Sequence, residues 1–227
     1  MSEAVTRRPV RLSALVSLLA ASVAVSLIEP AATVGMFVMV VGIAVTREGA
    51  HRFRETNRLF GTAALGIGGI VSIAGVGLAA TSVTRVPGMV EVGLGIVGLG
   101  CLGLGTLPLR GTGSRLLVKL GNAAILLCIV GGGLFQDAGT IPLLLSCAAL
   151  VLSWDAAENS INVGEQLGRE SKTWPVESAH LGVTAVVGGI AVVSGLVVRD
   201  LGTPGLPLHS VVFLLVALVF LTLALHD

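Results

Sequence analysis

The chain has 227 residues, of which 54% are hydrophobic and only 12% are charged, and its mean hydropathy is +0.96. This composition excludes an ordinary water-soluble domain, because the charges are gathered between apolar runs long enough to span a bilayer. The formal net charge is +1, from 14 basic and 13 acidic residues, so the basic excess that nucleic-acid binding requires is absent. The lipid bilayer is therefore the expected partner, and nucleic acid is not.

The apolar runs predict an all-α, polytopic transmembrane bundle that occupies residues 1–227 as a single domain. A helix needs about 20 residues to cross the hydrocarbon core. About eight segments qualify: 12–28, 31–46, 59–83, 88–109, 116–135, 140–154, 178–198 and 206–225. The second and sixth are short, and the tight Glu29-Pro30 turn leaves open a re-entrant hairpin for the first two. Either alternative gives an even number of crossings.

The basic residues predict the orientation, because Arg and Lys collect in cytoplasmic loops. With the N-terminus inside, twelve of the 14 bases fall on the cytoplasmic side: Arg7, Arg8, Arg11, Arg47, Arg52, Arg54, Arg58, Arg110, Arg115, Lys119, Arg169 and Lys172. Only Arg85 and Arg199 remain outside. We therefore expect a multi-pass protein of the cell membrane with both termini in the cytoplasm.

Small residues inside the apolar segments indicate close helix packing. Ala64, Gly68 and Ser72 recur every four residues and form one smooth stripe on the third segment, which predicts a helix–helix contact. The fourth segment is the richest in glycine. We interpret these small residues as positions where helices pack closely. The alternative is that they line a pore, which the glycine content alone does not exclude.

Residues 155–177 form a polar cytoplasmic loop that differs from the rest of the chain. Trp154 and Trp174 flank it at the depth where indoles favour the membrane interface. We expect the sixth helix to extend beyond the membrane surface into this loop, until the chain breaks near Trp174-Pro175. Pro175 then suits the first turn of the seventh helix.

This loop holds the candidate polar cluster, which consists of Asp155, Glu158, Glu177 and His180. Each pair is spaced by three residues and so shares one side of its helix. If the two helices pack antiparallel, three carboxylates and an imidazole meet, as a metal or proton site would require. The alternative is structural: Glu177 favours a helix N-terminus, Asp155 and Glu158 are solvated, and His180 makes a local hydrogen bond.

Other chemistry has little support in the sequence. Glu91, and Lys119 with Asn122, lie near helix ends, where their side chains can reach the interface, and no acid, base or histidine lies near a helix midpoint. GxSxG, HExxH and phosphate-loop motifs are absent. We therefore expect no enzyme, no cofactor and no bound metal. Glu165, Gln166 and Arg169 remain candidate contact residues for a partner.

Residues 153–195 resemble an uncharacterised haloarchaeal family of multi-pass membrane proteins, a domain of unknown function. The resemblance rests on Trp154-Asp155, Glu158, the run GEQLGR at 164–169, and Glu177 with His180 before a glycine-rich helix. It implies a setting near MoxR-type AAA ATPases and their von Willebrand-type or transglutaminase-like partners, and hence a role in envelope assembly. A halophilic, archaeal source fits the 12 Arg among the 14 bases and the five acids in 155–177.

Three functions remain open. The leading hypothesis is a non-catalytic anchor or scaffold for a cell-envelope or membrane complex. A small-solute transporter or channel is the alternative, which would require a cavity at mid-membrane. A membrane-embedded metal-dependent enzyme is the third, which would require the cluster around Asp155 to converge on one point.

Overall fold

A computed structural model describes residues 9–55, 58–107, 113–136, 138–167 and 173–200 of the protein. In these ranges the chain forms seven α-helices and one short 3-10 turn, η1 (Pro30–Ala32). The helices are α1 (Arg11–Ile28), α2 (Thr33–Glu55), α3 (Arg58–Ser82), α4 (Val86–Thr106), α5 (Arg115–Phe135), α6 (Thr140–Leu167) and α7 (Trp174–Asp200). All seven are long and apolar enough to cross a membrane.

These helices correspond to the first seven predicted segments, and the eighth, 206–225, lies outside the described residues. The predicted ends at 46 and 154 were too early, because α2 and α6 continue to Glu55 and Leu167. With 28 residues, α6 is about 42 Å long and exceeds a hydrocarbon core of about 30 Å. Its last turns, up to Leu167, are polar and follow the apolar part without a break. α1 and α2, with 18 and 23 residues, are each long enough to cross alone.

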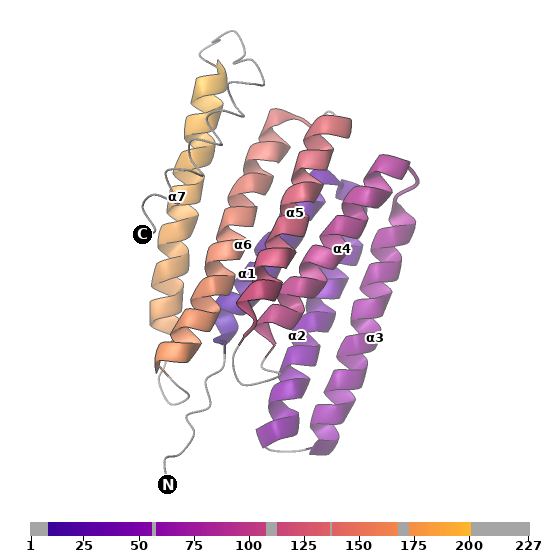
Figure 1. Cartoon of the computed structure of the whole chain (residues 1–227), viewed down its shortest axis with the longest axis vertical. Helices are drawn as coiled ribbons and strands as arrows, with labels where there is room; N and C mark the ends of the chain where they lie inside the picture. Colours follow the sequence, from indigo (N-terminus) through magenta and orange to yellow (C-terminus); the bar gives the residue numbers. More distant parts are fainter. Residues whose placement is uncertain (1–8, 56–57, 108–112, 137, 168–172, 201–227) are drawn as a thin grey trace.

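The helices form a bundle in which α1 is the most enclosed element. α7 lies beside α6 at one edge, the α2–α3 pair lies at the other, and α4 and α5 lie between them (Figure 1). α1 contacts α2, α4, α5, α6 and α7, and more than half of its residues are buried. Large side chains from four helices fill the centre: Leu18, Met36, Leu99, Leu102 and Ile125 are fully buried.

The α2–α3 pair packs backbone against backbone. A Cβ placed on Gly42 would lie 2.8 Å from the carbonyl oxygen of Gly68, and one placed on Gly49 would lie 2.9 Å from the Cβ of Ala64. Ser72 meets Gly42 in the same seam. The stripe of Ala64, Gly68 and Ser72 is therefore a helix–helix contact, as the sequence predicted.

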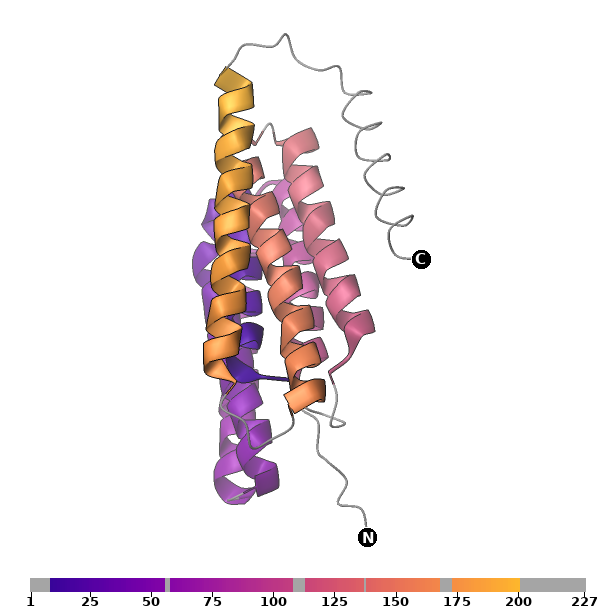
Figure 2. The ribbon, with the colours of Figure 1, turned by 90° about the vertical axis from the view of Figure 1, so that its left-hand side faces the viewer.

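α7, the last described helix, has buried side chains only near its start. Among the described side chains of α7, only Glu177 and Leu181 are buried, and both belong to its first turns. The remainder of α7 contacts α6 but leaves most of its side chains exposed. α7 lies at the outside of the bundle (Figure 2). The position of α7 therefore depends on the contacts of its start.

Replacing Gly68 by alanine is expected to destabilise the bundle by about 1–3 kcal/mol, because the new Cβ would lie 2.5 Å from the backbone nitrogen of Thr46 and force the two helices apart. Gly66→Ala is the matched control in the same helix, since nothing lies within 4 Å of its Cβ position. Thermal unfolding in detergent measures both. Equal stability of the two variants would contradict the backbone packing described above.

Candidate functional site

The polar groups of interest gather at the end of the bundle where α1, α3, α5 and α7 begin and α2, α4 and α6 end. We call it the arginine-rich end, because it is the side predicted to hold most of the bases. α1 begins there without a side-chain cap from its preceding residue, Val10. The backbone N–H groups of such a first turn have no partner within the helix.

Glu177 of α7 caps the start of α1. Its Oε2 accepts hydrogen bonds from the backbone N–H of Ser13 at 2.8 Å and from the Ser13 hydroxyl at 2.9 Å, while its Oε1 accepts one from the Thr173 hydroxyl at 2.7 Å. The side chain is 2% exposed. A carboxylate at a helix N-terminus is stabilised by the unpaired N–H groups and by the helix dipole, which explains how this buried charge is accommodated.

Two further helices hold the same turn. Arg47 of α2, itself buried, donates from Nη2 to the carbonyl oxygens of Pro9 at 2.9 Å and Val10 at 3.0 Å, and it interacts electrostatically with Glu177. The N–H of Val10 donates to the carbonyl oxygen of Ser160 in α6 at 2.8 Å. The start of α1 is therefore bound by α2, α6 and α7 together.

Asp155 and His180 form the one pair of the predicted cluster that the structure brings together. The Nε2 of His180 lies 2.8 Å from the Oδ2 of Asp155, and the Thr184 hydroxyl donates to the same oxygen at 2.6 Å. Both ionisable side chains are about a third or more exposed, so the pair lies at the surface between α6 and α7. This contact requires the antiparallel packing of α6 and α7 that the sequence analysis assumed.

Glu158 faces α5 instead of α7. Arg115 at the start of α5 donates to Glu158 at 3.1 Å, to Asn162 at 2.7 Å and to Glu165 at 3.0 Å. We call these four residues the α5–α6 platform. Gln166 is exposed beside it, and Arg169 lies outside the described residues.

Asp155, Glu158, Glu177 and His180 therefore do not meet at one point in the structure. The three carboxylates bind groups on different helices: Asp155 binds α7, Glu158 binds α5 and Glu177 binds α1. A spacing of three residues still separates two side chains by about 60° around a helix, which is enough to aim them at different neighbours. In the part of the chain that the structure describes, no three His, Cys, Asp or Glu residues are placed to hold a metal ion.

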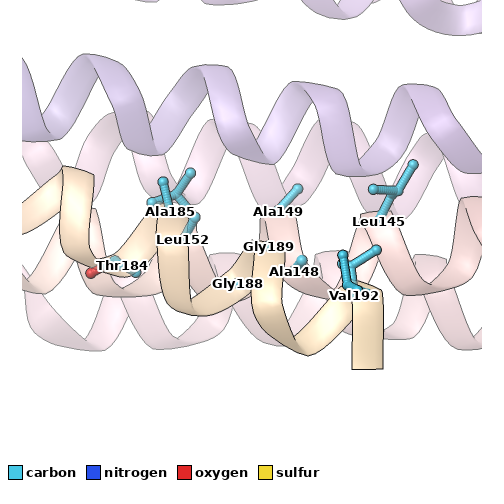
Figure 3. Close-up of a pocket in the computed structure, with 10 residues that line it drawn as sticks. Leu145, Ala148, Ala149, Leu152, Thr184, Ala185, Gly188, Gly189 and Val192 are labelled. Atoms are coloured by element: carbon cyan, nitrogen blue, oxygen red, sulfur yellow. The ribbon is translucent and has the colours of Figure 1, made fainter. Parts of the chain in front are cut away.

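An apolar groove of about 370 Å³ runs between α6 and α7, next to the Asp155–His180 pair (Figure 3). Leu145, Ala148 and Leu152 line its α6 side. Small residues of α7, Gly188 and Gly189, line the other side, and Thr184 lies at the end nearest Asp155. Its walls offer little polar chemistry, so the groove suits a hydrocarbon surface and not a charged solute.

Sequence reasoning misjudged or missed several polar residues. Glu91 was expected to reach the interface, but it is 2% exposed and points into the bundle. Its partner Gln136, the neighbouring Glu29, and Ser13 were not singled out. Glu29 precedes a proline in a predicted outer turn, a position at which a buried acid could have been suspected. Ser13 and Arg47 carry no such signal, because each resembles an ordinary helix residue.

The fold and these contacts define a multi-pass α-helical membrane protein whose described charged side chains are concentrated at the two ends of its bundle. The chain belongs to DUF7519, a family of unknown function, which it matches over residues 64–222. The match includes most of α3 and all of α4 to α7, and it leaves α1 and α2 outside. No curated protein and no solved structure matches the chain. The haloarchaeal source implied by the resemblance stays a prediction.

Glu177→Ala is expected to destabilise the protein by about 3 kcal/mol, because it removes the cap of α1 and one of the two acids, with Glu48, that favour the charge of the buried Arg47 guanidinium. His180→Ala is the matched control on the same helix. Its pair with Asp155 is exposed, so the loss should stay below about 1 kcal/mol. Chemical or thermal unfolding in detergent measures both, and a Glu177 variant as stable as the His180 variant would show that the cap contributes little.

Proposed function

We propose that this protein is a non-catalytic membrane anchor that holds a partner complex at the arginine-rich end of its bundle. The observation that carries the proposal is the extension of α6 beyond the length of a membrane span, fixed in place by the α5–α6 platform. A helix end that is ordered by a second helix offers a partner a preformed surface, which reduces the entropy lost on binding.

The chemistry of that surface favours recognition by a protein. Glu165 is partly exposed and Gln166 is exposed, and both lie within one turn of the end of α6. Carboxylate and amide groups on a fixed helix suit a polar, basic surface on a partner. The family resemblance makes a MoxR-type AAA ATPase the first partner to test.

The interior of the bundle supports an anchor more than a transporter. Leu18, Leu99 and Ile125 are fully buried where a solute path would have to run. Catalysis has equally little support, because Asp155, Glu158 and Glu177 are each engaged by a different helix. The described centre is therefore packed with side chains that offer neither a passage nor a reactive group.

The test places a photo-crosslinking residue at position 166 in the full-length chain in its native membrane. We expect a specific partner to be crosslinked there, and not from the matched exposed position 85 at the opposite end of the bundle. The same partner should then move from the membrane fraction to the soluble fraction when the gene is deleted, because an anchor is what holds it there.

The double variant Glu165→Lys, Gln166→Lys makes this surface basic and should also release the partner to the soluble fraction. It should change stability by less than about 1 kcal/mol, because the ion pair it removes is at the surface. Arg85→Glu is the control and should leave the partner bound. A partner that stays in the membrane fraction without this protein would overturn the proposal, and solute flux in proteoliposomes of the purified chain would favour transport instead.

A further inference from the structure

A second polar cluster lies at the opposite end of the bundle. It joins Glu29, directly after α1, Glu91 of α4 and Gln136, directly after α5. The Nε2 of Gln136 donates to the Oε2 of Glu91 and lies 3.4 Å from the Oε2 of Glu29. Two carboxylates therefore converge on one amide nitrogen.

Both carboxylates are buried, and Arg85, the one described base that acts on Glu91 electrostatically, forms no ion pair with it. Glu29 is 5% exposed and Glu91 is 2% exposed. Within the described ranges, neither forms an ion pair with Arg, Lys or His. The Oε1 of Glu91 is buried and accepts no hydrogen bond there. Because burial of a carboxylate without a direct counter-charge costs several kcal/mol, this cluster favours a positive charge closer than Arg85.

The backbone around the cluster also favours a cation. Glu29 and Gln136 follow the C-terminal ends of α1 and α5, and the C-terminal end of a helix carries a negative partial charge. Two glycines leave space for the carboxylates. A Cβ on Gly88 would lie 2.8 Å from the Oε2 of Glu29, and a Cβ on Gly131 would lie 3.4 Å from the Oε1 of Glu91.

We propose that Glu29, Glu91 and Gln136 form a binding site for a hard divalent cation of the Ca²⁺ class. The amide group of Gln136 bridges the two carboxylates, so it must withdraw from the space between them to admit the ion. A half-turn of that amide exchanges the nitrogen for its carbonyl oxygen, so that Gln136 becomes a third oxygen ligand. Two positive charges balance the two carboxylates.

The geometry selects Ca²⁺ over Mg²⁺. Ca²⁺ accepts six to eight oxygen ligands in flexible arrangements, including main-chain carbonyls, whereas Mg²⁺ demands an octahedron and releases its waters reluctantly. Gln136 is partly exposed, so the ion reaches the buried carboxylates from the end of the bundle and not through its centre. The ion would tie the ends of α1 and α5 to the start of α4.

The test uses the full-length chain in nanodiscs of phosphatidylcholine, a neutral lipid, and titrates Ca²⁺ by calorimetry while thermal unfolding is followed in parallel. One Ca²⁺ per chain and a higher unfolding temperature with Ca²⁺ are expected. Glu91→Gln and Glu29→Gln should each weaken binding at least about tenfold and remove the Ca²⁺-dependent rise in unfolding temperature. Glu48→Gln, an acid at the arginine-rich end, should bind as the wild type does.

Gly88→Ala separates the geometry of the site from its charge. It keeps both carboxylates but displaces Glu29, so weaker Ca²⁺ binding is expected from a variant whose unfolding without Ca²⁺ remains cooperative. Binding that survives in both glutamine variants would place the ion elsewhere and overturn the proposal. A wild type that binds no Ca²⁺ at millimolar concentration, and whose stability changes with pH alone, would show that a proton neutralises the pair and would also overturn it.

Discussion

The arrangement of the bundle depends on the buried carboxylate of Glu177, which lies at the start of the central helix, α1. α1 has no capping side chain of its own, and Glu177 supplies the acceptor that its first turn lacks. Because α1 contacts five other helices, fixing its first turn also fixes the register of its neighbours. The Ser17–Ser153 contact with α6 and the position of Leu18 in the core both follow from that register. The same carboxylate holds α7, whose remaining surface is mostly exposed.

The two ends of the bundle differ in how their charges are compensated. At the arginine-rich end, several described acids have basic partners. Glu48 forms an ion pair with Arg52, and Arg115 forms ion pairs with both Glu158 and Glu165. At the other end, the direct partner that Glu29 and Glu91 share within the described ranges is the neutral amide of Gln136, and Arg85 forms no ion pair with Glu91. A compensated surface can bind a partner without a change in its own charge state, whereas an uncompensated pair attracts a small positive ion. The two proposals therefore rest on opposite electrostatic conditions within one fold.

Apolar runs were sufficient to predict the seven described helices, because a bilayer forces the backbone to satisfy its hydrogen bonds within each crossing segment. Hydropathy could not predict where α2 and α6 end, since it marks the lipid-facing length while helical hydrogen bonds continue into the polar turns up to Glu55 and Leu167. The contacts of the candidate site could be predicted even less well from the sequence. Spacing placed Asp155 near His180 once antiparallel packing was assumed, but nothing in the sequence indicated that Glu158 would face α5. The bond between Ser13 and Glu177 joins residues 164 positions apart, a separation at which local pattern carries no information.

That separation also sets an order of assembly. At a synthesis rate of about 5–20 residues per second, the first helix is made roughly ten seconds or more before the residue that completes its hydrogen bonding. During that interval the Ser13 N–H must be satisfied by water or by lipid headgroups, which keeps the start of α1 at the membrane surface. α1 thus reaches its final hydrogen bonding only after the start of α7 has been made.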